Sequence, residues 1–175
     1  MSNDAFNRTA NVIFIVTCVV LVALAVTRRN DATAGAATVA PGARAEIVAT
    51  GTKLDPINGV SYTDADLTVA LVLNTECPFC RDSIPFYRQL TERRRAGKVQ
   101  LVAASLEPRD ALEQYLREHD VAVDHVVHLD RPEAIPTTGT PTVVVIGRDG
   151  VVRSSWLGRL DSTQERDLLR AITVS

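Results

Sequence analysis

Short apolar runs rich in Val, Leu and Ile recur along most of the chain, between segments of helical periodicity. Runs of this kind, bounded by turn residues, predict buried strands. The expected strands are Leu67–Leu73, Val99–Ala104, a weaker one within Val121–Leu129, Thr142–Ile146 and Val151–Trp156. Gly147-Arg148-Asp149-Gly150 separates the last two and contains an Asp-Gly pair, which is typical of a hairpin.

Helical segments alternate with these runs. The expected helices are Phe79–Ala96 before Gly97, one that starts near Pro108, and one that a capping box of Ser162 and Glu165 opens. Helices between strands imply right-handed crossovers and parallel pairing, which the closing hairpin completes with an antiparallel edge. The expected fold class is α/β, a mixed sheet with helices on both faces.

The N-terminal segment has a different pattern. The 19 residues Thr9–Thr27 carry no charge, and Arg8 and Arg28-Arg29 bound them. At the helical rise they would cover roughly 28 Å, close to the thickness of a bilayer core. This pattern predicts a transmembrane helix or a signal segment. The charged residues directly after it favour an uncleaved anchor, because a cleavage site needs small residues there.

Composition separates the rest of the chain into a linker and one domain. Residues 30–45 are rich in Ala, Thr, Gly and Pro, which predicts a flexible tether. We therefore expect a membrane anchor at 1–29, a tether at 30–45 and a globular domain at 46–175. Of the 175 residues, 46% are hydrophobic, which is enough for one core. The net charge of −2 indicates no nucleic-acid partner.

The candidate chemistry lies in Cys77-Pro78-Phe79-Cys80, which follows the first expected strand and opens a helix. Free backbone N–H groups at a helix start stabilise a thiolate, and the thiolate is the reactive form of cysteine. Pro78 fits the first helical turn. The spacing lets a second sulfur resolve a mixed disulfide, so Cys77 is the candidate nucleophile and Cys80 the resolving thiol.

Other roles for the two cysteines compete with this one. They could form a passive structural disulfide, or join His125-x-x-His128 in a zinc site. A c-type haem attachment would need His after Cys80, where Arg81 stands. We expect no metal site.

Together with Pro85 and Thr140-Pro141, these residues resemble the thioredoxin superfamily over residues 45–173. The resemblance implies that Pro85 kinks the helix and that Pro141 is a cis-proline facing the cysteines. It also implies that the backbone of Thr140 receives the substrate chain. Phe79 is expected to be exposed beside the site, where it contacts partners.

The anchor, tether and domain together look most like membrane-anchored TlpA/ResA-like thiol–disulfide oxidoreductases. That resemblance implies a single-pass membrane protein whose domain lies on the periplasmic side, although counting Arg28-Arg29 favours the opposite orientation. It implies protein disulfides or dithiols as substrates, reduction as the preferred direction, and a redox protein that recharges the pair. The redox-active disulfide needs no cofactor. A redox-inert interaction module and an oxidant of protein dithiols remain the alternatives.

Two positions depart from the usual pattern of this group. Ser83 stands where the group can carry an acid, and Glu76 directly precedes Cys77. A carboxylate so close is expected to raise the pKa of Cys77 by charge repulsion, or to shuttle protons to Cys80.

Overall fold

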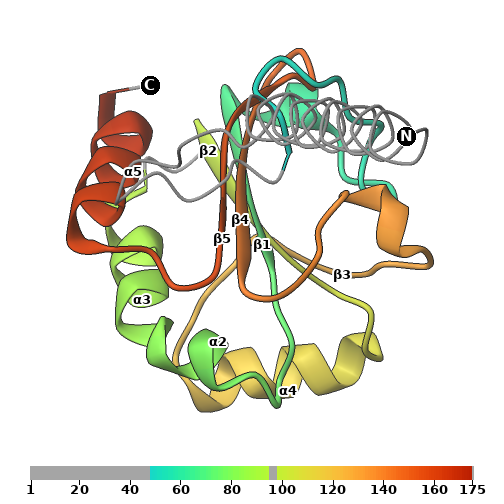
Figure 1. Cartoon of the computed structure of the whole chain (residues 1–175), viewed down its shortest axis with the longest axis vertical. Coiled ribbons are helices and arrows are strands. Elements are labelled where there is room, and N and C mark those ends of the chain that lie inside the picture. The colour runs from blue at the N-terminus through green and yellow to red at the C-terminus, as the bar shows by residue number, and fades with distance from the viewer. Residues whose placement is uncertain (1–47, 95–97, 175) are drawn as a thin grey trace, which may run out of the picture. The chain divides into compact units, whose positions relative to one another are not determined.

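A five-stranded mixed sheet forms the centre of the domain (Figure 1). The computed structural model describes residues 48–94 and 98–174. The strands are β1 (Leu67–Val72), β2 (Val99–Ser105), β3 (His125–His128), β4 (Thr142–Gly147) and β5 (Val152–Leu157), in the spatial order β3-β2-β1-β4-β5. Strands β1, β2 and β3 run parallel, whereas β4 is antiparallel to both β1 and β5. The predicted mixed sheet with a closing antiparallel hairpin is confirmed.

The central strands correspond to the continuous apolar runs of the sequence. Every residue of β2 and β4 is buried, and so is every residue of β1 after the first. A strand covered on both faces favours apolar side chains at successive positions, because neither face meets water. The edge strands β3 and β5 are only partly buried, and β3 takes up four residues of the predicted stretch Val121–Leu129.

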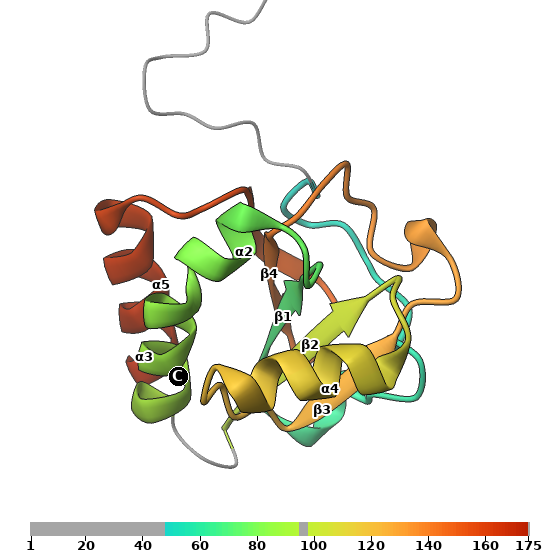
Figure 2. The ribbon, with the colours of Figure 1, turned by 90° about the horizontal axis from the view of Figure 1, so that it is seen from below.

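The α-helices of the described residues lie on one face of the sheet (Figure 2), so the prediction of helices on both faces is wrong. They are α2 (Pro78–Asp82), α3 (Ile84–Arg93), α4 (Arg109–Glu118) and α5 (Ser162–Val174). Their buried side chains join one core cluster with Val69, Leu101 and Val145 of the sheet. The two crossovers, from β1 to β2 and from β2 to β3, step in the same direction across the sheet. Two right-handed crossovers in one direction place their helices on the same face.

The opposite face is covered by chain that contains only short 3-10 turns among the described residues. These are η1 (Tyr62–Asp64), before β1, and η2 (Pro132–Ala134), between β3 and β4. A second core cluster lies between this cover and the sheet. Its residues from outside the strands are Val48, Leu54, Ile57, Val60, Tyr62, Leu129 and Ile135. A pocket opens beside the carboxyl ends of β1 and β2, at the margin of this cover.

The helix predicted over Phe79–Ala96 is instead broken at Ser83 into α2 and α3. Pro85 accounts for the break, because it has no N–H to donate and its ring clashes with the carbonyl four residues earlier. Ser83 closes α2: its N–H donates to the Cys80 carbonyl at 3.1 Å and its hydroxyl to the Phe79 carbonyl at 2.8 Å. A short helix carrying both cysteines is thereby separated from the longer helix that packs in the core.

The last helix, α5, is capped one residue earlier than the sequence suggested. Asp161, not Ser162, is the capping residue, and its carboxylate accepts the N–H groups of Thr163 and Gln164 at 2.9 and 3.0 Å. Gln164 Oε1 in turn accepts the Asp161 N–H at 3.0 Å. This reciprocal pair is a capping box with aspartate and glutamine in place of the predicted Ser162 and Glu165.

The predicted membrane anchor and tether lie outside the described residues. Within residues 48–94 and 98–174, none of the helices has the length and apolar character needed to cross a membrane.

Candidate active site

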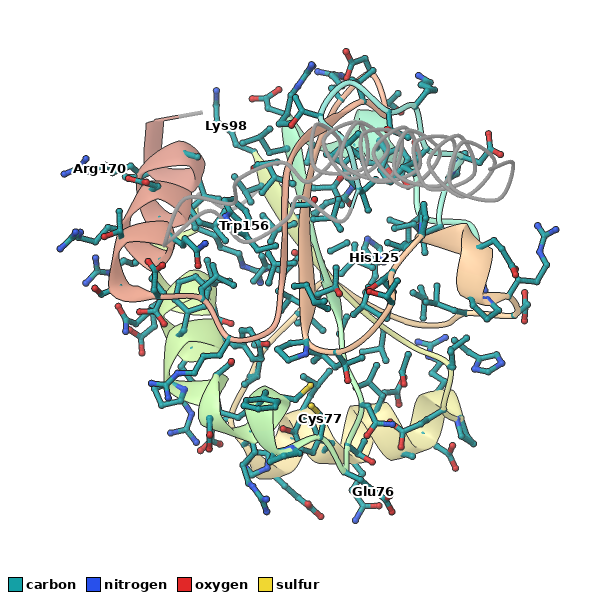
Figure 3. All side chains as sticks on the ribbon, viewed as in Figure 1. Glu76, Cys77, Lys98, His125, Trp156 and Arg170 are labelled. Carbon is teal, nitrogen blue, oxygen red and sulfur yellow. The ribbon has the colours of Figure 1, made fainter. Side chains whose placement is uncertain are left out.

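Cys77 lies at the start of α2, directly after the loop that leaves β1 (Figure 3), and Cys80 is within this helix. Cys77 is the N-cap residue with an extended backbone, and Pro78 occupies the first turn. Cys77 is half-buried, whereas the side chain of Cys80 has no exposed surface. Both are free thiols. The pair therefore consists of one sulfur that a partner can reach and one that it cannot.

Cys77 contacts Thr140, which lies 63 positions later in the chain. The Sγ atom of Cys77 donates to the carbonyl of Thr140 at 3.3 Å. The Thr140-Pro141 peptide bond is cis, and Pro141 is buried at the start of β4. The structure thus brings Cys77 and Thr140 together, as the resemblance to the thioredoxin superfamily implies. Their roles with a substrate stay predictions.

The surroundings of Cys77 favour its thiolate. Burial alone raises the pKa of Cys77, but hydrogen bonds from the Thr140 side chain, the Cys80 thiol and the N–H groups of Cys80 and Phe79 outweigh it. The pKa of Cys77 therefore lies below its ordinary value of 9.0. Donation of the thiol to the Thr140 carbonyl acts in the opposite direction, since it stabilises the protonated form. The net result is a larger thiolate fraction at neutral pH than a free cysteine has.

Cys80 is shifted in the other direction. Burial raises its pKa most, the backbone of Asn74 opposes this, and the hydrogen bond and charge of Cys77 add to it. The pKa of Cys80 reaches about 12. At neutral pH Cys80 is a neutral thiol, which suits a group that acts second.

Neither a protein-family model nor a curated protein matches the sequence. Solved structures of similar fold do match the domain. The domain is similar to a thiol-disulfide isomerase from Corynebacterium glutamicum, with 20% identity and a TM-score of 0.52 over 75% of this chain and 98% of that one. It is similar to the thioredoxin domain of a thiol-disulfide oxidoreductase from Bacteroides vulgatus, with 13% identity and a TM-score of 0.56 over 71% and 99% of the chains. It is also similar to StoA from Bacillus subtilis, with 16% identity and a TM-score of 0.50 over 71% of this chain and 97% of that one.

The domain has a thioredoxin-like fold. Within this fold, Glu107 holds the loop before the cysteines, which the sequence did not reveal. Its carboxylate accepts both the N–H and the hydroxyl of Thr75 at 2.7 Å, two residues before Cys77. Its own N–H donates to Ser105 Oγ at 3.0 Å, at the end of β2. Glu107 therefore ties the loop to the sheet. The only sequence signal for this role is an acid two residues after a buried strand.

Glu76 directly precedes Cys77, and its effect on the cysteine pair stays a prediction. Its side chain is exposed and lies at the outer edge of the molecule (Figure 3), and its N–H donates to Asn74 Oδ1 at 3.0 Å. The groups that set the pKa of Cys77 do not include Glu76, and that pKa is lowered. An exposed carboxylate is screened by water and ions, which weakens its repulsion of a nearby thiolate. Proton transfer between Glu76 and Cys80 stays a prediction.

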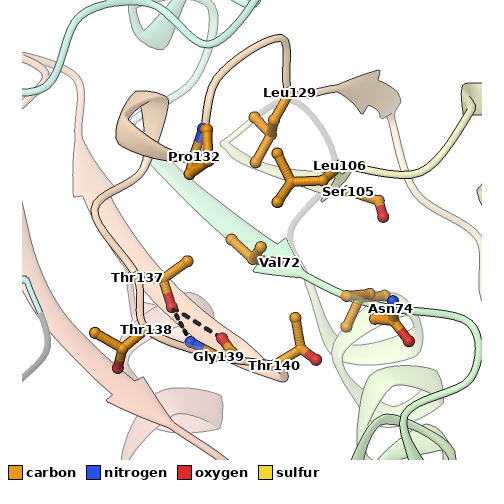
Figure 4. A pocket seen from close by; sticks show the side chains of 11 residues that line it. Val72, Asn74, Ser105, Leu106, Leu129, Pro132, Thr137, Thr138, Gly139 and Thr140 are labelled. Carbon is orange, nitrogen blue, oxygen red and sulfur yellow. Dashed lines mark hydrogen bonds between the residues drawn. The ribbon is translucent and has the colours of Figure 1, made fainter.

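An apolar surface adjoins the cysteines in this thioredoxin-like fold. Phe79 is 58% exposed, as predicted, and so lies open to a partner. A pocket of about 310 Å³ runs from Thr140 and Asn74 to an apolar end formed by residues such as Leu106 and Leu129 (Figure 4). Leu106 is itself 55% exposed. Phe79 and this pocket are thus two exposed apolar features near Cys77.

The histidines of the zinc alternative lie on β3, and His128 Nδ1 is 2.8 Å from the carbonyl of Glu107. Among the described residues, no three His, Cys, Asp or Glu side chains come close enough together to hold a metal ion.

The two thiols are expected to titrate far apart. In Cys80→Ser, alkylation of Cys77 by iodoacetamide should have its midpoint below pH 9.0, because the thiolate reacts and hydrogen bonds stabilise it. In Cys77→Ser, the midpoint for Cys80 should lie well above pH 9.0, because burial disfavours its charge. Mass spectrometry over a pH series gives both rates, with the urea-denatured proteins as controls. Coincident midpoints in the folded variants would contradict the assignment.

Proposed function

We propose that this domain is a thiol–disulfide oxidoreductase that acts on protein disulfides or dithiols. The observation that carries the proposal is the asymmetry of the pair. Cys77 is accessible with a lowered pKa, and Cys80 is fully buried with a raised one. The names of the similar structures support the same chemistry.

In the reducing direction, the Cys77 thiolate attacks one sulfur of the substrate disulfide. A bond forms between Cys77 and that sulfur, the substrate disulfide breaks, and the other sulfur leaves as a thiolate. Cys80 then attacks Cys77 Sγ, the Cys77–Cys80 bond forms, and the bond to the substrate breaks. The proton of Cys80 passes to the departing sulfur. Two electrons thus move from the dithiol to the substrate, and no diffusible cofactor takes part.

The substrate chain is proposed to lie along Thr140 and Pro141, over Cys77. This position is supported by the 3.3 Å contact of Cys77 Sγ with the Thr140 carbonyl, because the backbone of Thr140 lies beside the reactive sulfur. The pocket beside Thr140 accepts an apolar side chain of the substrate, and exposed Phe79 contacts the chain on the other side.

Reduction of substrates is the proposed direction, following the resemblance to the ResA-like group, and oxidation of protein dithiols is the alternative. The reduction potential of the pair against its partners decides between them. In either direction, a second redox protein must restore the starting state of Cys77 and Cys80.

Loss of either thiol is expected to abolish turnover. Cys77→Ser removes the nucleophile, and Cys80→Ser removes the resolving thiol, so insulin-disulfide reduction should fall to background in both. Cys80→Ser alone should accumulate mixed disulfides on Cys77, visible on non-reducing gels. Thr173→Ser, a conservative change on α5, is the folded control. Undiminished turnover in both cysteine variants would refute the proposed function.

We further propose that residues 1–29 anchor the protein and that the domain lies on the periplasmic side. The uncharged run Thr9–Thr27 and the small-residue tether 30–45 support this arrangement. A reporter enzyme that folds only outside the cytoplasm, fused after Ala45, should be active and sediment with membranes. Activity of a cytoplasm-specific reporter at the same position would overturn the orientation.

A further inference from the structure

Two buried tyrosine hydroxyls share the core with Cys80 and have no evident structural use. Tyr87 on α3 is 1% exposed, and Tyr115 on α4 is 7% exposed. Both side chains belong to the core cluster that contains Cys80. Among the described residues, neither hydroxyl oxygen has a hydrogen-bond partner.

Such groups are rare in folded proteins. A buried hydroxyl without a partner costs free energy, because it gives up its hydrogen bonds to water. Phenylalanine would fill nearly the same volume at either position without that cost. Two unpaired hydroxyls in one cluster therefore call for a role outside folding.

Both hydroxyls lie within electrostatic reach of the cysteines. Burial raises the pKa of each tyrosine most, and the charge of a Cys80 thiolate raises it further, so Tyr115 reaches about 12 and Tyr87 lies higher still. Cys77 raises the pKa of both, and Arg81 of α2 lowers that of Tyr115. For Tyr87, Tyr115 raises the pKa further and the side chain of Ser83 lowers it. At neutral pH both tyrosines are neutral phenols, each with one O–H to donate.

Resting on the proposed function, we propose that Tyr87 and Tyr115 are positioning residues that turn their O–H dipoles toward Cys80 and stabilise its thiolate during the resolving step. The resting Cys80 is a neutral thiol with no water-exposed surface of its own. Its negative charge appears only as its sulfur attacks Cys77, and hydroxyls not engaged elsewhere can reorient toward it. A neutral phenol is a poor base, so the proton of Cys80 still passes to the departing substrate sulfur.

The resolving step can be observed separately from the first step. Reaction of the reduced protein with 5,5′-dithiobis(2-nitrobenzoate) forms a mixed disulfide on Cys77 and releases one coloured thiolate. Attack by Cys80 then releases a second. Stopped-flow absorbance over a pH series gives both rates.

The test compares Tyr87→Phe, Tyr115→Phe and the double variant with Tyr62→Phe. Tyr62 is also buried, but it lies in the other core cluster and donates to the Asp55 carbonyl at 2.8 Å. In the double variant, the second release should slow about tenfold at neutral pH and its profile should move about one unit to higher pH. Each single variant should show a smaller change of the same sign. The first release should change less than twofold, and Tyr62→Phe should change neither.

Stability separates this role from a structural one. Because each Phe variant loses an unpaired hydroxyl, its urea midpoint should equal or exceed that of the wild type, so the slower second release cannot be ascribed to unfolding. A second release with unchanged rate and pH profile in the single and double variants would overturn the inference. If Cys80→Ser released the second thiolate as fast as the wild type, the proposed function itself would fail instead.

Discussion

The antiparallel register between β1 and β4 is the constraint on which the site depends. Val72 at the end of β1 lies opposite Thr142 at the start of β4. The chain that leaves β1 and the chain that enters β4 must therefore meet at the same edge of the sheet. Cys77 follows the first of these and Thr140 precedes the second, so their 3.3 Å contact follows from strand pairing. Both strands are almost entirely buried, and a slip of one residue would move every side chain into the other core cluster, whose packing partners differ.

The difference between the two thiols arises from where α2 begins and ends. As the N-cap, Cys77 remains at the surface beside free N–H groups, whereas Cys80 turns into the core that α3 and α4 complete. The break at Ser83 keeps this helix short, and the tie between Glu107 and Thr75 holds the loop before it. One sulfur can then carry charge at neutral pH while the other remains protonated until it is needed.

Local sequence patterns were enough to predict the strands and the cysteine pair, whereas its approach to Thr140-Pro141 followed from the resemblance to the thioredoxin superfamily. Continuous apolar runs and a Cys-x-x-Cys at a helix start depend on neighbouring residues alone. The face on which each helix packs depends on the direction of successive crossovers, which the alternation of elements does not specify. The contact between Glu107 and Thr75 joins residues 32 positions apart, so no local pattern could predict it. The unpaired Tyr87 hydroxyl could not be predicted either, because it depends on which side chains pack around it in the folded core. At Asp161 and Ser162, two good capping residues stood side by side, and the sequence did not distinguish them.

The most direct test of the account is the redox equilibrium of the Cys77–Cys80 pair. The domain would be equilibrated in glutathione buffers of graded potential, quenched by acid, alkylated and weighed by mass spectrometry. We expect one reversible two-electron transition, in which the ratio of dithiol to disulfide changes tenfold for about every 30 mV. The same curve should be reached from the oxidised and from the reduced protein. A pair that stays reduced across the range, or a disulfide that glutathione cannot reopen, would contradict it.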